Sequence, residues 1–367
     1  LWPAPAVIAL LLAGFAWLGL SRALRRRQQE NYVVQSVPLK AERPTIGTSM
    51  GSALVTGGAG FIGSNLVRSL AASGVRVRVL DDLSTGSKEN LRDLNGSVEV
   101  VEGDVRDRAA VRRAVEGSEV VFHLAALPTV ARSVADPVTS HDVNVTGTLN
   151  VLTAARDAAV RRVVYASSSS VYGDTPTLPK REDMAVRPLS PYAAAKLAGE
   201  AYCRGFANVY DLETVSLRFF NVFGPRQDPS SEYAAVIPRF ASALLAGERP
   251  VVFGDGRQSR DFTFVANAVQ ACLLAAEAGS QASGEAMNIG CGERITILGL
   301  VEALNDILAT DIEPFFSEPR AGDVRHSEAA IEEAGRLIGY RPHVSLREGL
   351  ERTVEWLQER RAVVGAG

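Results

Sequence analysis

Short runs of β-branched and other apolar residues alternate with alanine-rich stretches over residues 53–218. Nearly continuous apolar runs are typical of strands buried on both faces of a parallel sheet, with helices covering those faces. We therefore predict an α/β fold with a doubly wound parallel sheet, in which ligands bind at the carboxyl edge. The predicted strands span residues 53–56, 75–80, 98–102, 120–124, 163–167 and 214–218, and helices are expected near residues 62–73, 107–116, 138–159 and 191–210.

The pattern changes after Asn221, where prolines divide the chain into shorter pieces at positions 225, 229, 238 and 250. Such a break is typical of a smaller lobe appended to a sheet domain. A final amphipathic helix is expected over residues 346–360, because Leu350, Val354 and Leu357 fall on one helical face. We predict a sheet domain over residues 50–220 and a smaller α/β substrate lobe over residues 221–367.

The segment before residue 50 contains a long apolar stretch. Residues 3–20 are almost wholly apolar, about the length of one membrane span, and arginines follow at positions 22, 25, 26 and 27. The positive-inside rule then places the rest of the chain on the cytoplasmic side, tethered to the membrane. The alternative is that residues 1–49, which end in a polar linker, do not belong to the functional protein, since the first methionine is Met50.

The composition supports a globular protein and excludes several kinds of site. Of the 367 residues, 46% are hydrophobic, which suffices for a sizeable core. The 39 basic and 42 acidic residues are mixed and give a net charge of −3, so no nucleic-acid surface is expected. The three cysteines and four histidines are scattered, which predicts neither a disulfide framework nor a metal site and suits the cytoplasm.

Three glycines lie at the predicted turn from the first strand to the first helix. Without side chains, Gly57, Gly60 and Gly63 let the backbone approach a pyrophosphate, which N–H groups at the start of the helix can bind. Asp81 follows at the end of the second strand, where a carboxylate can bind ribose hydroxyls and would repel a 2′-phosphate. The sequence therefore predicts an NAD site, although Asp81 and Asp82 also fit a solvated turn.

Tyr192 and Lys196 lie one helical turn apart on the same face of a predicted helix. The positive charges of Lys196 and of a bound nicotinamide ring would stabilise the phenolate form of Tyr192, which could then act as a base. Ser168 follows the fifth strand and would hydrogen-bond the same substrate oxygen. Taken alone, the Tyr192–Lys196 pair also fits a surface helix, and Ser168 also fits a loop. Together, and downstream of a dinucleotide-binding turn, they indicate a site for hydride transfer.

From about residue 52 to the C-terminus, the sequence resembles the extended short-chain dehydrogenase/reductase superfamily and, within it, the UDP-glucose and UDP-N-acetylglucosamine 4-epimerases. The resemblance implies that Tyr192 is the base, that Lys196 also binds the nicotinamide ribose, and that Ser168 assists. The motifs that carry it are Thr56 to Gly63, Asp81 to Gly86, Ser167 to Gly173, Tyr192 with Lys196, and Arg218 to Gly224.

The motifs and the resemblance together predict two binding sites. Asp104 comes just after the third strand, where it can meet the adenine end of NAD, and the resemblance places Asn144 in the cofactor pocket. The predicted cofactor residues are Gly57, Gly60, Phe61, Ile62, Gly63, Asp81, Asp82, Ser84, Thr85, Gly86, Asp104, Val105, Leu124, Ala125, Ala126, Asn144, Tyr192, Lys196, Phe219 and Val222. The predicted substrate residues are Ser168, Ser169, Tyr192, Asn221, Gln227, Ala235, Val236, Arg260, Arg320, Asp323 and Ser327.

The reaction that the resemblance implies is inversion at C4 of a UDP-sugar. The C4 hydrogen leaves as hydride to NAD while Tyr192 takes the hydroxyl proton, which gives a 4-keto sugar. Hydride then returns to the opposite face of the sugar. No net oxidation occurs, so NAD has to stay bound through the cycle.

The predicted substrate lobe also indicates specificity. Arg260 and Arg320 suit a diphosphate, because guanidinium groups bind phosphate oxygens with two hydrogen bonds, although both arginines also fit surface ion pairs. In the family that the chain resembles, a gate position limits the space beside C2 of the sugar, and here that position is Ser327. A small residue would admit an N-acetyl group, so acetylated and non-acetylated UDP-sugars are expected substrates. Pro128 departs from the lysine that some glucose-specific members carry.

Other activities use the same motifs. Dehydratases of the superfamily usually carry an Asp-Glu pair where this chain has Ser169 and Ser170, so water elimination is not expected. A UDP-glucuronate 4-epimerase or decarboxylase is an open alternative. An alternative of another class is a non-catalytic NAD-binding protein, and the intact Ser168, Tyr192 and Lys196 argue against it. Apolar residues on more than one face of the helices at 138–159 and 191–210 predict a homodimer.

Overall fold

The computed structural model describes residues 48–94, 96–228, 235–319 and 324–365, which belong to one compact unit. The apolar segment predicted at residues 3–20 lies outside the described residues. Among the helices within the described ranges, none is long and apolar enough to cross a membrane.

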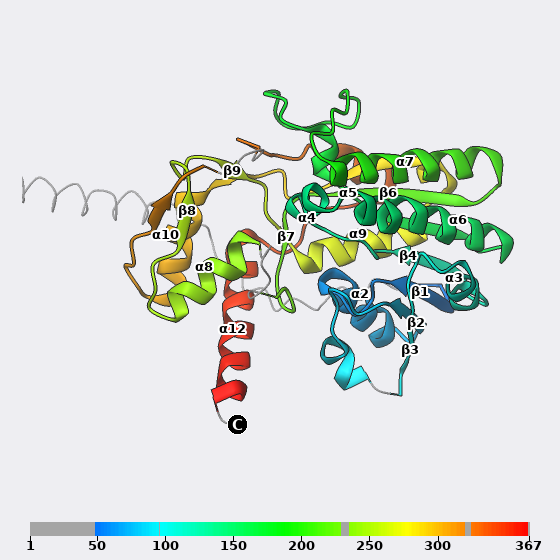
Figure 1. Cartoon of the computed structure of the whole chain (residues 1–367), viewed down its shortest axis with the longest axis horizontal. Coiled ribbons are helices and arrows are strands. Elements are labelled where there is room, and N and C mark those ends of the chain that lie inside the picture. Colours follow the sequence, from blue (N-terminus) through cyan, green and yellow to red (C-terminus); the bar gives the residue numbers. More distant parts are fainter. Residues whose placement is uncertain (1–47, 95, 229–234, 320–323, 366–367) are drawn as a thin grey trace, which may run out of the picture. The chain divides into compact units, whose positions relative to one another are not determined.

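A sheet of seven parallel strands forms the centre of the unit (Figure 1). The chain adds β2 and β3 on one side of β1 and then returns to the other side with β4. In sheets of this order, ligands bind at the carboxyl ends of the strands where the direction reverses. The predicted doubly wound parallel sheet is confirmed. In spatial order, the strands are β11 (Glu285–Ile289), β6 (Glu213–Phe219), β5 (Arg162–Ser168), β4 (Val120–His123), β1 (Ser52–Thr56), β2 (Arg76–Asp81) and β3 (Val98–Glu102).

Six of these strands coincide with predicted apolar runs, but β11 was not predicted. It pairs with β6 from Glu285 opposite Val215 to Ile289 opposite Phe219. Its sequence contains an asparagine and a methionine and no run of β-branched residues, so its local pattern is weak. Because β11 comes from the later part of the chain, the sheet contains residues from both sides of the boundary predicted at residue 221.

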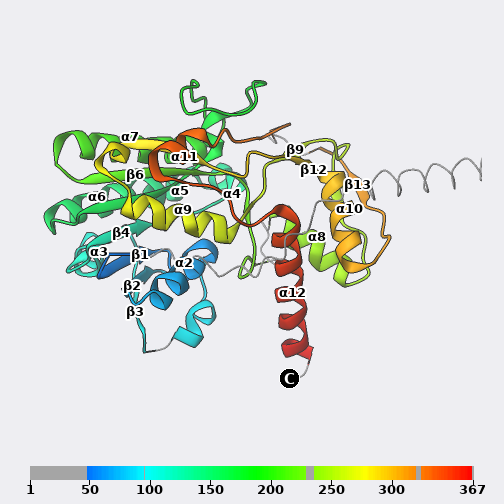
Figure 2. The same ribbon diagram turned by 180° about the vertical axis from the view of Figure 1, so that it is seen from behind.

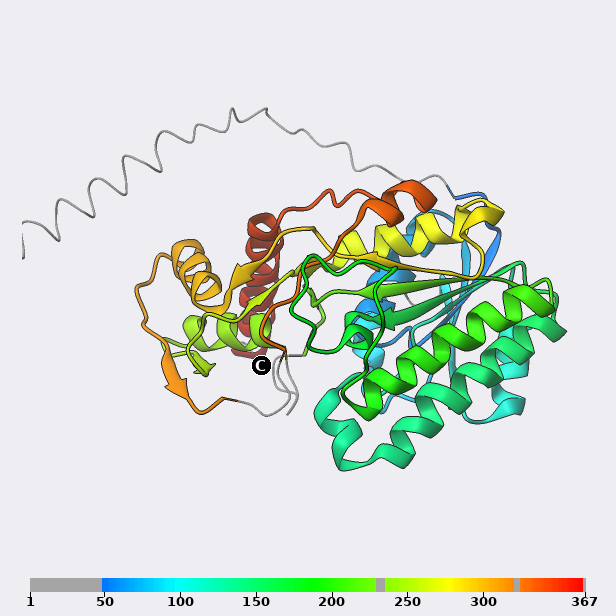
Figure 3. The same cartoon turned by 90° about the horizontal axis from the view of Figure 1, so that it is seen from above.

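Helices cover both faces of the sheet, since alternate strand residues point to two separate cores. One core contains Val55 and Val79 together with residues of α2 and α9, and the other contains Leu54 and Leu80 together with residues of α3, α6 and α7. Figure 3 shows α6 and α7 side by side on their face, and Figure 2 shows α11 beside α9. These helices are α2 (Phe61–Ala72), α3 (Arg108–Val115), α6 (Gly147–Asp157), α7 (Pro191–Val209), α9 (Val265–Glu277) and α11 (Glu332–Ile338).

The prediction of a single helix over residues 138–159 is wrong in detail. After α4 (Val130–Ala135), the chain forms α5 (Pro137–His141), a π-helical turn η2 (Asp142–Thr146) and then α6. In this turn the Asn144 amide pairs with the backbone of Leu127, accepting from its N–H at 2.9 Å and donating to its carbonyl at 3.2 Å. Such turns often occur at functional sites, and apolar periodicity alone does not reveal them.

Short strand pairs and three helices form the second lobe. The helices α8 (Val236–Leu245), α10 (Ile297–Leu308) and α12 (Leu346–Gly365) pack against one another (Figure 1). The predicted C-terminal amphipathic helix is confirmed, because Leu350, Val354 and Leu357 are buried. The strand pairs are β7 (Val222–Phe223) with β10 (Thr263–Phe264), β8 (Val251–Phe253) with β13 (Phe315–Ser317), and β9 (Ser259–Arg260) with β12 (Ile295–Thr296); the 3₁₀ turns are η1 (Lys88–Leu94), η3 (Ser169–Tyr172) and η4 (Ser280–Ala282).

Candidate active site

The glycine turn joins β1 to α2 at the carboxyl edge of the sheet. Gly57 has a φ of +69°, in the left-handed region, and a Cβ there would lie 2.7 Å from the backbone nitrogen of Ala125. A Cβ on Gly63 would lie 2.1 Å from the carbonyl oxygen of Gly57. Gly60 precedes α2 and gives it no side-chain cap, so no capping side chain competes for the N–H groups of the first turn. This cradle fits the pyrophosphate of a dinucleotide.

Asp81 ends β2 beside this turn and is 7% exposed. Its carboxylate accepts hydrogen bonds from the backbone N–H groups of Ala59 and Leu83, both at 2.9 Å. Burial raises the pKa of Asp81, and these two hydrogen bonds oppose the rise. A Cβ on Gly86 would lie 3.0 Å from Asp81 Oδ1, so Gly86 leaves room for the carboxylate. Because each carboxylate oxygen can accept a further hydrogen bond, Asp81 fits the ribose of NAD.

The two other predicted carboxylates are more exposed than Asp81. The side chain of Asp82 accepts hydrogen bonds from the backbone N–H and the hydroxyl of Ser84, at 2.9 and 2.7 Å, as a solvated turn does. Asp104 is half-buried and forms an ion pair with Arg106, which lowers the pKa of Asp104. The solvated-turn interpretation therefore describes Asp82, while Asp81 is built into the turn.

The remaining predicted cofactor residues follow or begin elements at the same edge, and Val105, just after β3, is buried. The N–H of Ala125 donates to Thr56 Oγ1 at 3.2 Å. Both polar atoms of the Asn144 amide bond to Leu127, so Asn144 shapes the loop after β4, and its contact with the cofactor stays a prediction. The others are Phe61 and Ile62 at the start of α2, Ser84 and Thr85 after β2, Leu124 and Ala126 after β4, Phe219 at the end of β6, and Val222 in β7.

His123 lies next to the site and was not identified from the sequence. It ends β4, is buried, and bonds Thr56 Oγ1 through Nδ1 at 2.7 Å and Thr148 Oγ1 through Nε2 at 2.9 Å. Burial lowers the pKa of His123 to about 3, and the positive charge of Lys196 acts in the same direction. The imidazole is therefore neutral at physiological pH. A lone histidine at a strand end gives no sequence signal that separates it from a core residue.

Lys196 lies on α7 one turn after Tyr192, as predicted. The hydroxyl of Ser190 caps this helix by accepting from the N–H of Ala193 at 3.2 Å. Lys196 is buried, and its Nζ donates to the carbonyl oxygen of Ala166 on β5 at 2.8 Å and lies 5.9 Å from the centroid of the Tyr192 ring. Burial lowers the pKa of Lys196 to about 8, so the ammonium form still predominates at pH 7.

Tyr192 is half-buried, and the Ser168 side chain lies near its phenol. Burial raises the pKa of Tyr192, and the nearby Ser168 hydroxyl opposes the rise. Ser168 ends β5, and its Oγ accepts from the N–H of Ser170 at 3.2 Å and from the Ser170 hydroxyl at 2.9 Å. Ser169, the other predicted serine, begins η3 and is half-buried. The phenol, the ammonium and the serine hydroxyl that the sequence predicted as one group therefore lie together.

A pocket of about 250 Å³ opens among β7, α8, β8 and β9. Four predicted substrate residues, Asn221, Ala235, Val236 and Arg260, line it, together with Val222, which was predicted to bind the cofactor. The sequence analysis missed the other residues of the wall, because isolated apolar residues on helices and strands look like ordinary core. They are Phe223, Ile237, Phe240, Val251, Phe253, Gln258, Phe262 and Ile297.

Asn221 connects this pocket to Ser327. Its backbone has a φ of +33°, and its Nδ2 donates to the carbonyl of Asp261 at 2.9 Å and to Ser327 Oγ at 3.2 Å. Gln227 donates from Nε2 to the carbonyl of Val222 at 3.3 Å, while its Oε1 is buried and has no hydrogen-bond partner within the described parts of the chain. Three substrate residues predicted from separate motifs therefore lie around one segment.

The predicted diphosphate residues are only partly described. Arg260 donates to the carbonyl oxygens of Ser259 at 2.9 Å and Arg325 at 3.1 Å while lining the pocket. Arg320 and Asp323 lie outside the described residues. Among the residues that the structure does describe, no group of three or more His, Cys, Asp or Glu side chains could hold a metal ion.

Comparisons with known proteins agree with this geometry. The family model of the NAD-dependent epimerase/dehydratase family matches residues 53–290. The UDP-glucose 4-epimerase of Mycolicibacterium smegmatis is 44% identical over 311 residues, covering 84% of this chain and 98% of that protein.

Two solved structures are similar over nearly their whole length. The UDP-N-acetylglucosamine 4-epimerase of Methanobrevibacter ruminantium, in complex with UDP-N-acetylmuramic acid, has a TM-score of 0.81 and 40% identity, covering 85% of this chain and 99% of that one. The UDP-glucose 4-epimerase of Thermotoga maritima, with UDP-glucose, has a TM-score of 0.81 and 39% identity, covering 84% and 99%. This chain belongs to the NAD-dependent epimerase/dehydratase family.

Proposed function

We propose that the protein is a UDP-sugar 4-epimerase that inverts C4 through a transient 4-keto sugar. The observation that carries this proposal is the convergence of Ser168, Tyr192 and Lys196 at the sheet edge that also carries the glycine turn. The chemistry that bound NAD supplies is reversible acceptance of hydride from C4 of the sugar. Gly57, Gly60, Gly63 and Asp81 would hold it, by the fit described above.

Tyr192 moves the proton in this scheme. Its phenolate oxygen takes the C4 hydroxyl proton as hydride leaves C4, and the same phenol returns the proton when hydride comes back to the opposite face. Ser168, whose side chain lies near the Tyr192 phenol, would orient the C4 oxygen. The buried ammonium of Lys196 favours the phenolate, because an opposite charge nearby lowers the free energy of the charged form.

The pocket fits the nucleotide half of the substrate. Its wall carries Phe223, Phe240, Phe253 and Phe262, whose rings can pack against a uracil base, and Arg260 supplies a positive charge for the diphosphate. Ser327 bonds Asn221 with a small side chain, which supports the proposal that N-acetylated sugars fit. UDP-N-acetylglucosamine and UDP-glucose are thus the proposed substrates.

A direct test incubates the purified protein separately with UDP-glucose, UDP-N-acetylglucosamine and UDP-glucuronate and follows the configuration at C4 by NMR. We expect inversion of the first two sugars without added NAD, because the cofactor stays bound. Conversion of UDP-glucuronate alone would replace the proposed substrate class. Folded, NAD-containing protein that converts none of the three would refute the proposal and favour a non-catalytic NAD-binding protein.

We also infer that two copies of the chain form a homodimer. Val130, Val134 and Val138 on α4 and α5 are exposed, and these helices pack beside α7, which exposes Tyr202 and Val209. A second copy would cover these apolar side chains.

Light scattering is expected to report a dimer for the wild type and a monomer for Val134→Glu combined with Val138→Glu. The control is Val100→Glu, an exposed valine on β3, which should leave the mass unchanged. A monomeric wild type would contradict the inference.

A further inference from the structure

Glu200 is a buried carboxylate that the proposed chemistry does not use. It lies on α7 one turn after Lys196 and is 7% exposed. Its Oε1 accepts from Arg218 Nε at 2.9 Å and its Oε2 from Arg218 Nη2 at 2.7 Å, so the ion pair is bidentate. Oε1 also accepts a hydrogen bond from the hydroxyl of Ser167. One side chain thus connects α7 to both β5 and β6.

The strand residues that Glu200 contacts lie next to proposed ligand-binding residues. Ser167 directly precedes Ser168, and Arg218 is three positions before Asn221. Ser167 and Arg218 also lie opposite each other in the β5–β6 pairing. The Glu200 carboxylate therefore joins the helix that carries Tyr192 to both strand ends, beside the hydrogen bond from Lys196 to Ala166 on β5.

Arg218 extends the same network to the far edge of the sheet. Its Nη1 donates to the hydroxyl of Tyr172 at 2.8 Å, and that hydroxyl donates to Asn288 Oδ1 on β11 at 2.7 Å. All three side chains are buried. A charged group in such surroundings has few alternative partners, so the bonded arrangement is strongly favoured.

We propose that Glu200 and Arg218 are positioning residues that hold Tyr192 and Lys196 in register with Ser168. This inference rests on the proposed epimerase function. Proton and hydride transfer need the reacting groups within a few tenths of an ångström of the productive geometry, and a misplacement of about 1 Å can cost roughly 100-fold in rate. Neither side chain needs to touch the sugar for this effect.

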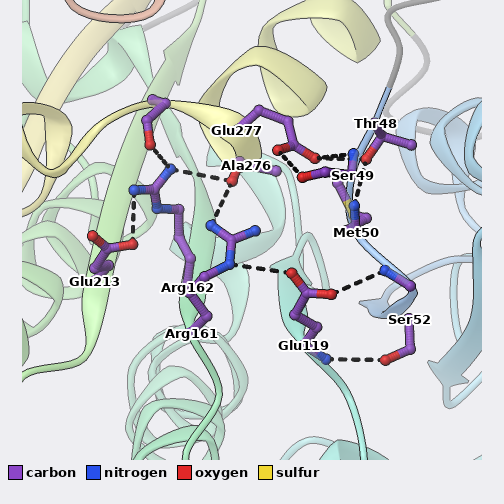
Figure 4. Close-up of polar contacts among 12 residues, drawn as sticks. Thr48, Ser49, Met50, Ser52, Glu119, Arg161, Arg162, Glu213, Ala276 and Glu277 are labelled. Atoms are coloured by element: carbon purple, nitrogen blue, oxygen red, sulfur yellow. Dashed lines mark hydrogen bonds and ion pairs between the residues drawn. The ribbon is translucent and has the colours of Figure 1, made fainter.

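The same two strands provide a matched control at their other end. Arg162 on β5 lies opposite Glu213 on β6, and Arg162 Nη2 donates to Glu213 Oε2 at 2.7 Å (Figure 4). Arg162 Nη1 also donates to carbonyl oxygens at the end of α9, among them that of Ala276 at 3.1 Å. This pair joins the strands to a helix as Glu200 and Arg218 do, but it contacts none of the proposed site residues.

The experiment compares Glu200→Gln with Glu213→Gln in the purified, NAD-containing protein. We expect Glu200→Gln to lower kcat for UDP-glucose roughly 10- to 100-fold while KM and NAD content stay within about twofold, because the geometry of the chemical step changes and binding does not. Glu213→Gln should keep kcat within about twofold. Equal kcat values for Glu200→Gln and the wild type would overturn the proposal, as would equal losses in both variants.

A double variant keeps the test valid if Glu200→Gln leaves the Arg218 charge unpaired and unfolds the protein. Replacing both partners of a buried ion pair is tolerated far better than replacing one. Folded Glu200→Gln combined with Arg218→Met is expected to retain NAD and still show the low kcat, whereas wild-type kcat would overturn the proposal. Ser167→Ala removes one hydroxyl from the network and should lower kcat several-fold. If neither Glu200 variant folds, this variant is the test, and an unchanged kcat would overturn the proposal. A wild type that epimerises no UDP-sugar would instead refute the proposed function.

Discussion

The strands β5 and β6 have an arginine–glutamate pair near each end, and the two pairs differ in burial, because Glu213 is half-buried while Glu200 is buried. At the amino end, Arg162 and Glu213 join the strands to the carbonyl groups that end α9. At the carboxyl end, Glu200 bonds Arg218 and Ser167, and Ser167 directly precedes the proposed site residue Ser168. The same pair of residue types thus stabilises the fold at one end and supports a candidate site at the other.

Buried polar atoms without a hydrogen-bond partner among the described residues occur at both ends, for example Arg162 Nε at the amino end and Gln227 Oε1 on the other side. Buried polar groups are normally hydrogen-bonded, and exceptions require an explanation. At the carboxyl edge, the first turn of α2 has no side-chain cap and Gln227 Oε1 has no partner among the described residues. The N–H groups in the uncapped first turn of α2 can bind a ligand at this edge. The carboxyl edge therefore differs from the amino end in this helix start, and ligands of such sheets bind at the carboxyl ends of the parallel strands.

The largest effect is expected at the proposed base. Tyr192→Phe removes the proton acceptor and should lower kcat by about 1,000-fold, within the range that acid–base catalysis contributes. NAD content should not change. Tyr202→Phe, an exposed tyrosine on the same helix, serves as the control and should keep wild-type kcat. The rate of C4 inversion is measured by NMR for both variants. A loss in kcat below about tenfold for Tyr192→Phe would show that another group moves the proton.

Burial of His123 at the end of β4 makes the free energy of unfolding depend on pH. Its pKa is about 3 in the folded protein against 6.5 ordinarily, so between these values the unfolded chain binds more protons. The free energy of unfolding therefore falls as pH drops from about 6.5 toward 3. Between pH 7 and 4.5 the His123 contribution should fall by roughly 3 kcal/mol, at about 1.36 kcal/mol per pKa unit. Urea unfolding of the wild type and His123→Gln at both pH values measures it, and parallel pH curves would contradict the expectation.

A substitution at Ser327 tests the proposed specificity for N-acetylated sugars. Ser327→Tyr should lower kcat/KM for UDP-N-acetylglucosamine by about 50-fold, because the larger side chain would occupy the space of the N-acetyl group. Turnover of UDP-glucose in the same variant is the internal control and should change less than about threefold. Unchanged acetylated turnover would remove Ser327 from the specificity argument.

The smallest effect separates two adjacent carboxylates. Asp81→Asn should weaken NAD binding about tenfold, because the buried carboxylate loses one acceptor for the ribose. Asp82→Asn is the matched control, since Asp82 is exposed and bonds only Ser84 among the described residues, and it should change affinity less than about twofold. Calorimetry with NAD on cofactor-stripped protein measures both. Equal losses would mean that local turn structure, and not the Asp81 charge, sets the affinity.

Local patterns predicted the sheet and the motif residues well. Each of the first six strands has its own β-branched run, and Tyr192 and Lys196 are separated by one helical turn whatever the tertiary structure. β11 was missed because its position depends on pairing with β6 and its own sequence is weak. The π-helical turn at Asn144 was also missed, because apolar periodicity does not show it, and its contact with Leu127 is a tertiary one.

The parts of the candidate site that the sequence did not predict are those made by tertiary packing. Phe240, Phe253 and Phe262 come from different elements and form one wall only when the second lobe folds. The spacing of Lys196 and Glu200 along α7 is visible in the sequence, but the partner Arg218 requires that β6 lie next to β5. The apolar segment at residues 3–20 and the residues Arg320 and Asp323 lie outside the described structure, so those predictions stand untested.

The amino-terminal edge of the sheet has a practical consequence. Just before β1, the hydroxyls of Thr48 and Ser49 donate to the carboxylate of Glu277, which ends α9 (Figure 4). This joint anchors the beginning of the described chain at the edge of the sheet away from Tyr192. An affinity tag or a covalent link to a solid support, attached ahead of Thr48, would thus be held at the amino-terminal edge of the sheet. The carboxyl edge, which carries Tyr192, would stay accessible to substrate when the protein is immobilised as a catalyst.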